Sequence, residues 1–107
     1  MMSAQFPLLI NAVSSGQTEM VEKLINGGYN INEQTDLGTT PAMIAINRND
    51  IVILKILINA GAKLDVCNCF GDTAISLASK LMRNNEGYWK QEYEKMVILL
   101  EEAMICT

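Results

Sequence analysis

The chain has 107 residues, enough for one domain, and its 50% apolar and 19% charged residues allow it to build a hydrophobic core. Its 12 acidic and 8 basic residues give a net charge of -4, which argues against a nucleic-acid partner, because phosphate-binding domains carry a basic excess. The chain contains no histidine, which excludes an imidazole general base or metal ligand.

The N-terminal stretch MMSAQFPLLINAVSSG is only superficially similar to a short signal peptide. It lacks a positively charged start, and Asn11 interrupts its apolar run. The longest apolar run of the chain, residues 51–58, is broken by Lys55 and is shorter than the roughly 18–20 residues of a membrane-spanning helix. We therefore expect no cleaved leader, no membrane partner and a cytoplasmic location.

The three cysteines are an odd number, whereas a secreted scaffold of this size usually has an even set. They are Cys67, Cys69 and Cys106. Free thiols in a reducing compartment fit this count. A closed zinc site wants four soft ligands, so we expect no metal.

A repeat of 33 residues runs through the chain, and near copies such as VEKLINGGYNIN and LKILINAGAKLD follow it. Matching residues occupy the pairs Leu24 and Leu57, Ile25 and Ile58, Asn26 and Asn59, Gly28 and Gly61, Ile31 and Leu64, Gly38 and Gly71, Thr40 and Thr73, and Ala45 and Ala78. The spacing divides the chain into units of about 2–34, 35–67 and 68–107.

Each repeated position predicts a local structure. Thr40 followed by Pro41 is the order of a helix N-cap and first turn, and Thr73 is expected to cap the corresponding helix of the third unit. Gly38 and Gly71 precede these caps, where a tight turn favours a positive φ. Each unit is therefore predicted to contain a turn, a short helix, a turn, a longer helix and a loop.

The second helix of each unit is predicted from apolar runs at residues 20–25 and 53–58. A helix that is apolar on most sides has to be covered on most sides. Gly28 and Gly61 would end these helices as left-handed caps. Small residues, which let two helices approach closely, recur at Ala12, Ala45 and Ala78.

The third unit departs from the spacing. Its apolar run at residues 96–100 aligns with residues 54–58 only after an insertion of about nine residues, near 82–92. The insertion either lengthens two helices or forms a loop. Glu101 and Glu102 then stand where a glycine cap is expected, which gives the last unit a polar exit.

The segments GTTPAMIA and INAGAKLDVCN resemble the motifs of the ankyrin-repeat family, and the resemblance extends from about residue 7 to about 102. It implies a single all-α domain over 1–107, a solenoid of three helix–turn–helix units with short hairpin-like loops. Pro7 stands where the first unit would have its threonine. The family's histidine would fall at Ile10, Met43 and Ser76, so we expect the hydrogen bonds it makes to be missing and the stability to be lower.

No catalytic motif is present: the sequence has neither a G-x-S-x-G elbow nor a phosphate-binding loop. The neighbouring acids Glu92 with Glu94, and Glu101 with Glu102, are typical of a solvated helix surface. We therefore expect no enzyme activity, no cofactor and no small-molecule substrate.

The resemblance implies a protein partner, bound by the loop tips and the inner face of the first helices. Carried over by register, the protein-binding residues are Asp36, Leu37, Asn47 and Arg48 in the second unit, and Cys69, Phe70, Asp72 and Lys80 in the third. Gln34, Thr39, Cys67 and Leu81 belong to the same surface, and the first unit adds little beyond Ser14 and Ser15.

Leu37 and Phe70 occupy equivalent loop positions where the family usually has polar residues. Either a partner covers them, or each tip packs on the neighbouring loop. Trp89 in the insertion has two interpretations as well: an anchor for a partner, or, as we favour, a lid over the final helix pair together with Tyr93 and Met96.

The function expected from these features is a small non-catalytic binder that blocks a partner protein, as inhibitor and immunity proteins do. The acidic charge would suit a basic partner such as a nuclease or a toxin. The alternative is an adaptor or accessory subunit that bridges two proteins and self-associates.

Overall fold

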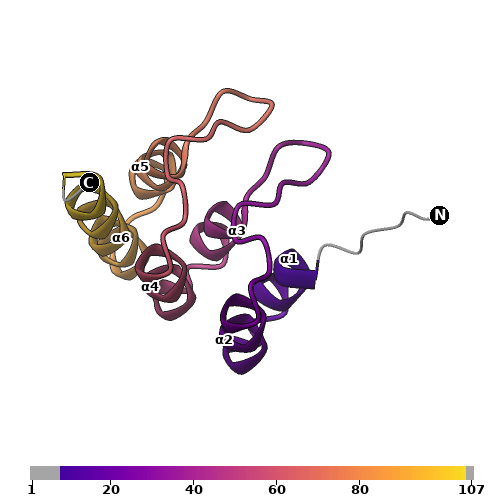
Figure 1. The fold of residues 1–107 in the computed structure, drawn as a ribbon. Coiled ribbons are helices and arrows are strands. Elements are labelled where there is room, and N and C mark those ends of the chain that lie inside the picture. The colour runs from indigo at the N-terminus through magenta and orange to yellow at the C-terminus, as the bar shows by residue number, and fades with distance from the viewer. Residues whose placement is uncertain (1–7, 106–107) are drawn as a thin grey trace.

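A computed structural model describes residues 8–105 of the chain (Figure 1). It contains the helices α1 (Leu8–Ser14), α2 (Thr18–Asn26), α3 (Pro41–Asn47), α4 (Ile51–Asn59), α5 (Ala74–Asn84) and α6 (Tyr88–Ile105), and no strand is found over this range. Consecutive helices pair as α1 with α2, α3 with α4, and α5 with α6. The three helix pairs predicted from the repeat are therefore confirmed.

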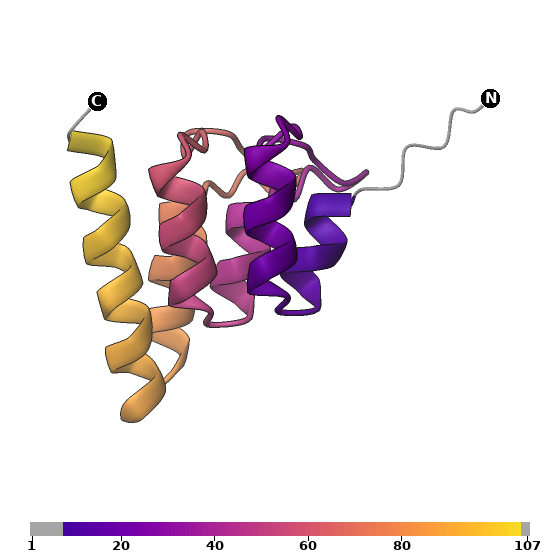
Figure 2. The same cartoon turned by 60° about the horizontal axis from the view of Figure 1, so that its bottom comes forward.

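The pairs stack side by side in two rows (Figure 2). The inner row consists of α1, α3 and α5, and the outer row of α2, α4 and α6. The two connecting segments, residues 27–40 and 60–73, project beyond the inner row as extended loops (Figure 1). The stack measures 46 × 28 × 26 Å, the elongated shape of a short solenoid.

The predicted helix caps are present in the second and third units. The hydroxyl of Thr40 accepts a hydrogen bond from the backbone N–H of Met43 at 3.2 Å, with Pro41 in the first turn. The hydroxyl of Thr73 accepts one from the N–H of Ser76 at 3.3 Å. Each hydroxyl satisfies an amide that the helix itself leaves without a partner.

In the first unit a residue from a distant part of the chain replaces the cap. Pro7, which stands at the threonine position, lies outside the described residues. The Glu33 carboxylate accepts a hydrogen bond from the backbone N–H of Ile10 at 2.9 Å. Because Ile10 is the repeat equivalent of Met43 and Ser76, the same amide is satisfied in all three units.

The core runs continuously through the three pairs. Its largest fully buried side chains are Leu9, Val13, Val21, Met43, Ile46, Ile53, Leu54, Leu57, Met96 and Leu100. The small residues predicted at helix contacts, Ala12, Ala45 and Ala78, are 4%, 0% and 0% exposed. Leu57 lies in the middle pair, so its side chain is covered from both neighbouring units.

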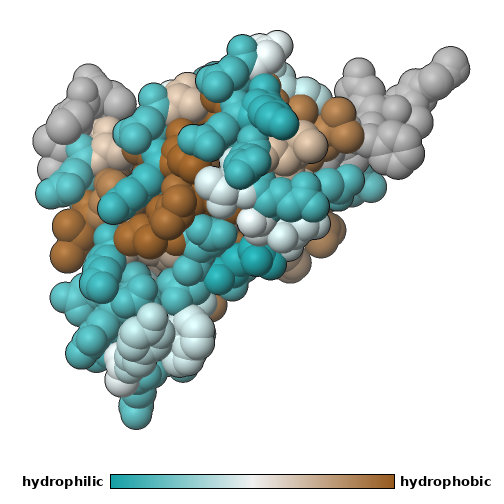
Figure 3. Space-filling model, turned by 90° about the horizontal axis from the view of Figure 1, so that it is seen from below, coloured by the Kyte–Doolittle hydropathy of each residue, from teal (hydrophilic) through white to brown (hydrophobic). Residues whose placement is uncertain are grey.

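The outer face of α4 is only partly covered. Val52 is 56% exposed and Ile56 is half-buried, while on the neighbouring α6 Ile98 is 48% exposed. Figure 3, which views the molecule from below, shows apolar surface gathered in the middle of this face with polar surface around it. Within the predicted run 53–58 every apolar residue is buried or partly buried, so the predicted cover is present there, whereas Met20 in the run 20–25 is 43% exposed.

The insertion in the third unit lengthens both helices, which settles the alternative that the sequence left open. α5 has 11 residues where α3 has 7, and the turns after them, residues 48–50 and 85–87, are equally short. α6 has 18 residues where α4 has 9. It continues through Glu101 and Glu102, since no glycine ends it there.

Tyr93 covers the end of the core, whereas Trp89 does not. Tyr93 is 7% exposed, and Met96 and Leu100 are fully buried on the same side of α6. Trp89 is 51% exposed, so the expectation that it acts as a lid was wrong. The stripe formed by Trp89, Tyr93 and Met96 exists, but Trp89 extends it beyond the beginning of α4.

Candidate protein-binding surface

The two connecting loops form turns of the same shape with different side chains. In the first, the N–H of Thr35 donates to the carbonyl of Thr39 at 3.0 Å, and the Thr35 hydroxyl accepts from the N–H of Thr39 at 3.1 Å. In the second, the N–H of Asn68 donates to the carbonyl of Asp72 at 2.9 Å. The Asn68 side-chain oxygen accepts from the amides of Phe70 and Asp72 at 2.9 and 3.0 Å. These bonds hold both tips in a fixed conformation.

The two loops contact each other through their backbones. The N–H of Cys69 donates to the carbonyl of Leu37 at 2.8 Å. Gly38 has a φ of +79°, and a Cβ atom there would lie 2.9 Å from the Cα of Asn68. Glycine is therefore required at position 38 both by the turn and by the neighbouring loop, and the spacing between the tips is set by this contact.

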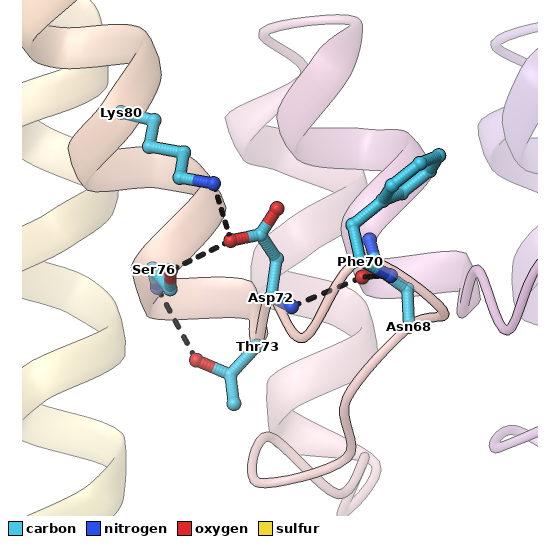
Figure 4. Close-up of polar contacts among 6 residues, drawn as sticks. All are labelled: Asn68, Phe70, Asp72, Thr73, Ser76 and Lys80. Carbon is cyan, nitrogen blue, oxygen red and sulfur yellow. Dashed lines mark hydrogen bonds and ion pairs between the residues drawn. The ribbon is translucent and has the colours of Figure 1, made fainter.

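The apolar side chains at the tips remain exposed although the loops touch. Leu37 is 56% exposed and Phe70 is 74% exposed. Figure 4 shows the Phe70 ring pointing away from the polar contacts beneath it. The tip side chains therefore do not pack fully on the neighbouring loop, since each keeps more than half of its surface exposed.

Asp72 and Lys80, two of the predicted binding residues, pair with each other. The ammonium of Lys80 lies 2.8 Å from the Asp72 carboxylate, and the Ser76 hydroxyl donates to the same oxygen at 3.0 Å (Figure 4). The hydrogen bonds from Lys80 and Ser76 hold the pKa of Asp72 below its ordinary value. Asp72 therefore links the loop to α5. Ser76, which stands at the position of the family's histidine, donates one of these hydrogen bonds.

Asn47 and Arg48 lie at the end of α3 that is farther from the loops. The Arg48 guanidinium donates to the carbonyl of Ser14, the last residue of α1, at 2.7 Å. A cation at a helix C-terminus also interacts favourably with the helix dipole. The structure thus links Arg48 to the first unit, while Asn47 is exposed.

The predicted binding residues therefore fall into four places, one of which is the pair of Asp72 and Lys80 where the second loop meets α5. Asp36, Leu37, Cys69 and Phe70 are exposed on the loops and form what we call the tip surface. Asn47 and Arg48 lie at the opposite end of α3, and Trp89 begins α6 at the end of the last helix pair. The sequence predicted all of these residues to bind a partner. In the structure, the loops bring the four residues of the tip surface together.

The charge at the tip surface comes from Asp36, which is exposed and makes no ion pair among the described residues. The thiols of Cys67 and Cys69 are exposed and free, and within residues 8–105 no group of three potential metal ligands comes together. Cys106 lies outside that range. The tip surface can therefore offer apolar contacts, one carboxylate and the thiol of Cys69 to a partner, and the thiol of Cys67 is exposed on the same loop.

A hollow of the described residues lies elsewhere. It encloses about 740 Å³ beside the C-terminal end of α6, between Ala103 and Met104 on that helix and Ile58 and Leu64 around the end of α4. Lys63 and Asp65 are the charged residues in its lining. It shares no residue with the tip surface, although residues 61–65 of its lining belong to the same loop as Cys69 and Phe70.

Comparison with known proteins identifies the stack. A family model described as ankyrin repeats in three copies matches residues 9–102. The chain belongs to the ankyrin-repeat family. The ankyrin fold serves as a module for protein–protein interaction. None of the helices in residues 8–105 has the length and apolar character to cross a membrane.

Relatives of this ankyrin chain come from several kinds of organism. A putative ankyrin repeat protein of fowlpox virus is 31% identical over 92% of the chain and 21% of its own length. An ankyrin repeat-containing protein of Schizosaccharomyces pombe is 30% identical over 75% of the chain and 39% of its own length. An ankyrin repeat, SAM and basic leucine zipper domain-containing protein of Notamacropus eugenii is 35% identical over 48% of the chain and 11% of its own length. The chain therefore spans well under half the length of these relatives.

Proposed function

We propose that the chain is a non-catalytic binder that blocks one partner protein by covering it with the tip surface, in the manner of an inhibitor or immunity protein. The observation that carries this proposal is the exposure of Leu37 and Phe70, at 56% and 74%, on turns that hydrogen bonds hold in place. Exposed apolar side chains on a rigid backbone lose little entropy on binding, and burying them in a partner is favourable.

The charge of the chain supports a basic partner such as a nuclease or toxin. The net charge is -4, and Asp36, next to Leu37 in the first loop, is exposed. Opposite charge raises the rate at which two proteins meet. Free, exposed thiols at Cys67 and Cys69 support a reducing compartment, and we place the function in the cytoplasm.

The test is capture of the partner from a lysate of the native host on immobilised protein. Phe70→Asp should release the captured protein, because it places a charge at the centre of the contact. A hot-spot residue of this kind contributes about 2 kcal/mol or more, which is about a thirtyfold loss of affinity. Val52→Asp is the matched control, since Val52 is also exposed and apolar but lies on α4. Retention of every captured protein by Phe70→Asp at full strength would disprove the tip surface.

The second candidate function is an adaptor that bridges two proteins. It is favoured by the separation of the exposed pair Tyr88 and Trp89 from the loops, at the end of the last helix pair. A bridging protein needs two surfaces that can be occupied at once. Light scattering of the purified chain separates the two functions, because a blocker stays monomeric and a self-associating adaptor gains mass with concentration.

A further inference from the structure

The lengthened α5–α6 pair ends in a projection that the other pairs lack. We call residues 83–91 the hairpin tip. Because the insertion adds four residues to α5 and the rest to α6, the hairpin tip extends about 6–8 Å past the corresponding turn of the second unit. Figure 2 shows the lower end of α5 and α6 reaching below the other helices. Within the hairpin tip every residue except Asn85 is exposed.

Two aromatic side chains stand on this projection. Tyr88 is 65% exposed and Trp89 is 51% exposed, and their rings meet edge to face with centroids 5.4 Å apart. Trp89 precedes the buried Tyr93 by one helical turn, so it continues the apolar stripe of α6. Neither α2 nor α4 extends far enough towards the hairpin tip to cover Trp89. Exposed tryptophan and tyrosine are the side chains that most often anchor a protein contact.

The charge of the hairpin tip is opposite to that of the whole chain. Residues 83–91 contain two basic residues and one acidic residue, in a chain whose net charge is -4. Arg83 and Lys90 are exposed and form no ion pair within residues 8–105, whereas Lys80 pairs with Asp72, and Glu92 pairs with Lys95. Within the hairpin tip two free cations therefore lie on the two helices that meet at the aromatic pair, against the acid Glu86. The exposed Glu94 lies one helical turn further along α6 from Lys90.

We propose that the hairpin tip is a second docking surface, which takes an acidic segment of a partner protein with an apolar side chain on Tyr88 and Trp89. Arg83 and Lys90 would face carboxylates of that segment, since charge complementarity selects an acidic occupant. A protein segment is the occupant to which the family's role as an interaction module points. The proposal does not depend on the tip surface, which is built from other residues.

The test uses Trp89, the only tryptophan of the chain, as its reporter. The protein is titrated with a short peptide of alternating glutamate and leucine, and with its lysine–leucine counterpart. The acidic peptide should shift the tryptophan emission to shorter wavelength in a saturable way, and added salt should weaken the effect. The basic peptide should give no saturable shift.

Two variants with the same change of formal charge make the test specific. Arg83→Glu with Lys90→Glu should weaken binding of the acidic peptide by about tenfold. Lys55→Glu with Lys63→Glu should leave it unchanged, because these exposed lysines lie on α4 and on the loop after it. Circular dichroism verifies that both variants keep the helix content of the parent.

Three results would overturn the proposal. The first is the absence of a saturable shift with the acidic peptide. The second is a shift produced only by phosphatidylserine vesicles or by the basic peptide, which would assign the aromatic pair to a lipid surface or to a basic ligand. The third is an equal loss in both double variants, which would reduce the effect to overall charge.

Discussion

The amide at the start of each inner helix shows how one repeat position is satisfied by different residues. The N–H groups of Met43 and Ser76 bond to the threonines three residues before them, as the sequence predicted. The equivalent N–H of Ile10 bonds to Glu33, 23 residues later. A local cap can be predicted from sequence because donor and acceptor are neighbours. The Glu33 contact could not, because it depends on how the first loop folds back on α1.

The pairing of Asp72 with Lys80 was missed for a similar reason. Register placed both residues on the face that binds partners, but their contact needs the angle at which the loop meets α5. The exposure of Leu37 and Phe70 was better predicted, since it follows from their place at the turn alone. Of the candidate site, the sequence thus predicted the tips and not the contacts beneath them.

Alanine substitutions at Gly38 and Gly71 test how closely the two loops contact each other. Both have a positive φ, +79° and +80°, but only at Gly38 would a Cβ atom meet another loop, 2.9 Å from the Cα of Asn68. Alanine at either position should lower the free energy of unfolding by about 1–2 kcal/mol, because a residue with a Cβ atom is strained at a positive φ. Gly38→Ala should lower the free energy of unfolding by about 1–3 kcal/mol more, because its Cβ atom would clash with Asn68. Urea unfolding of the two variants gives this difference, and equal losses would show that the loops do not press on each other.

At the scale of the helices, the insertion is the element that sequence reasoning left open. Residues 74–84 contain no glycine or proline, and the turn-favouring residues Asn85 and Gly87 follow them. The short turn at 85–87 then forces the remaining added residues into α6. Spacing alone could not decide this, because it counts residues without saying whether they are helical.

Leu57 tests the register of α4. Its side chain is fully buried at the centre of the stack, so Leu57→Ala should reduce the free energy of unfolding by about 2–5 kcal/mol. Val52→Ala on the same helix is the control, and it should cost less than about 0.5 kcal/mol because Val52 is 56% exposed. Thermal or urea unfolding measures both. A Leu57→Ala protein as stable as the parent would mean that α4 presents a different face to the core.

At the scale of the whole molecule, the two ends of the stack are unlike. At the first unit Leu8 and Met20 are 49% and 43% exposed, whereas their repeat equivalents Pro41 and Ile53 are buried against a neighbouring unit. At the other end Tyr93, Met96 and Leu100 close the core. The repeat itself, the all-α class and the number of units were all predicted, because they depend on spacing that every unit shares.

This difference predicts a gradient of stability along the stack, because each unit is stabilised by its neighbours. Amide hydrogens in α1 and α2 should exchange with solvent faster than those in α5 and α6, as measured by exchange with mass spectrometry. Arg48→Met removes the bond to Ser14 and should speed exchange in α1 while leaving α6 unchanged. Uniform protection from α1 to α6 would show that the stack opens only as a whole.

The backbone bond between Cys69 and Leu37 has a consequence for how the protein can be altered. That bond uses main-chain atoms, so it survives exchanges of side chains that leave Gly38, Thr35 and Asn68 in place and do not put proline, which lacks the donating N–H, at position 69. A randomised library at positions 36, 37, 69 and 70 would therefore display many different chemistries on one unchanged support. Variation confined to four codons could redirect the molecule to a new target without a new fold.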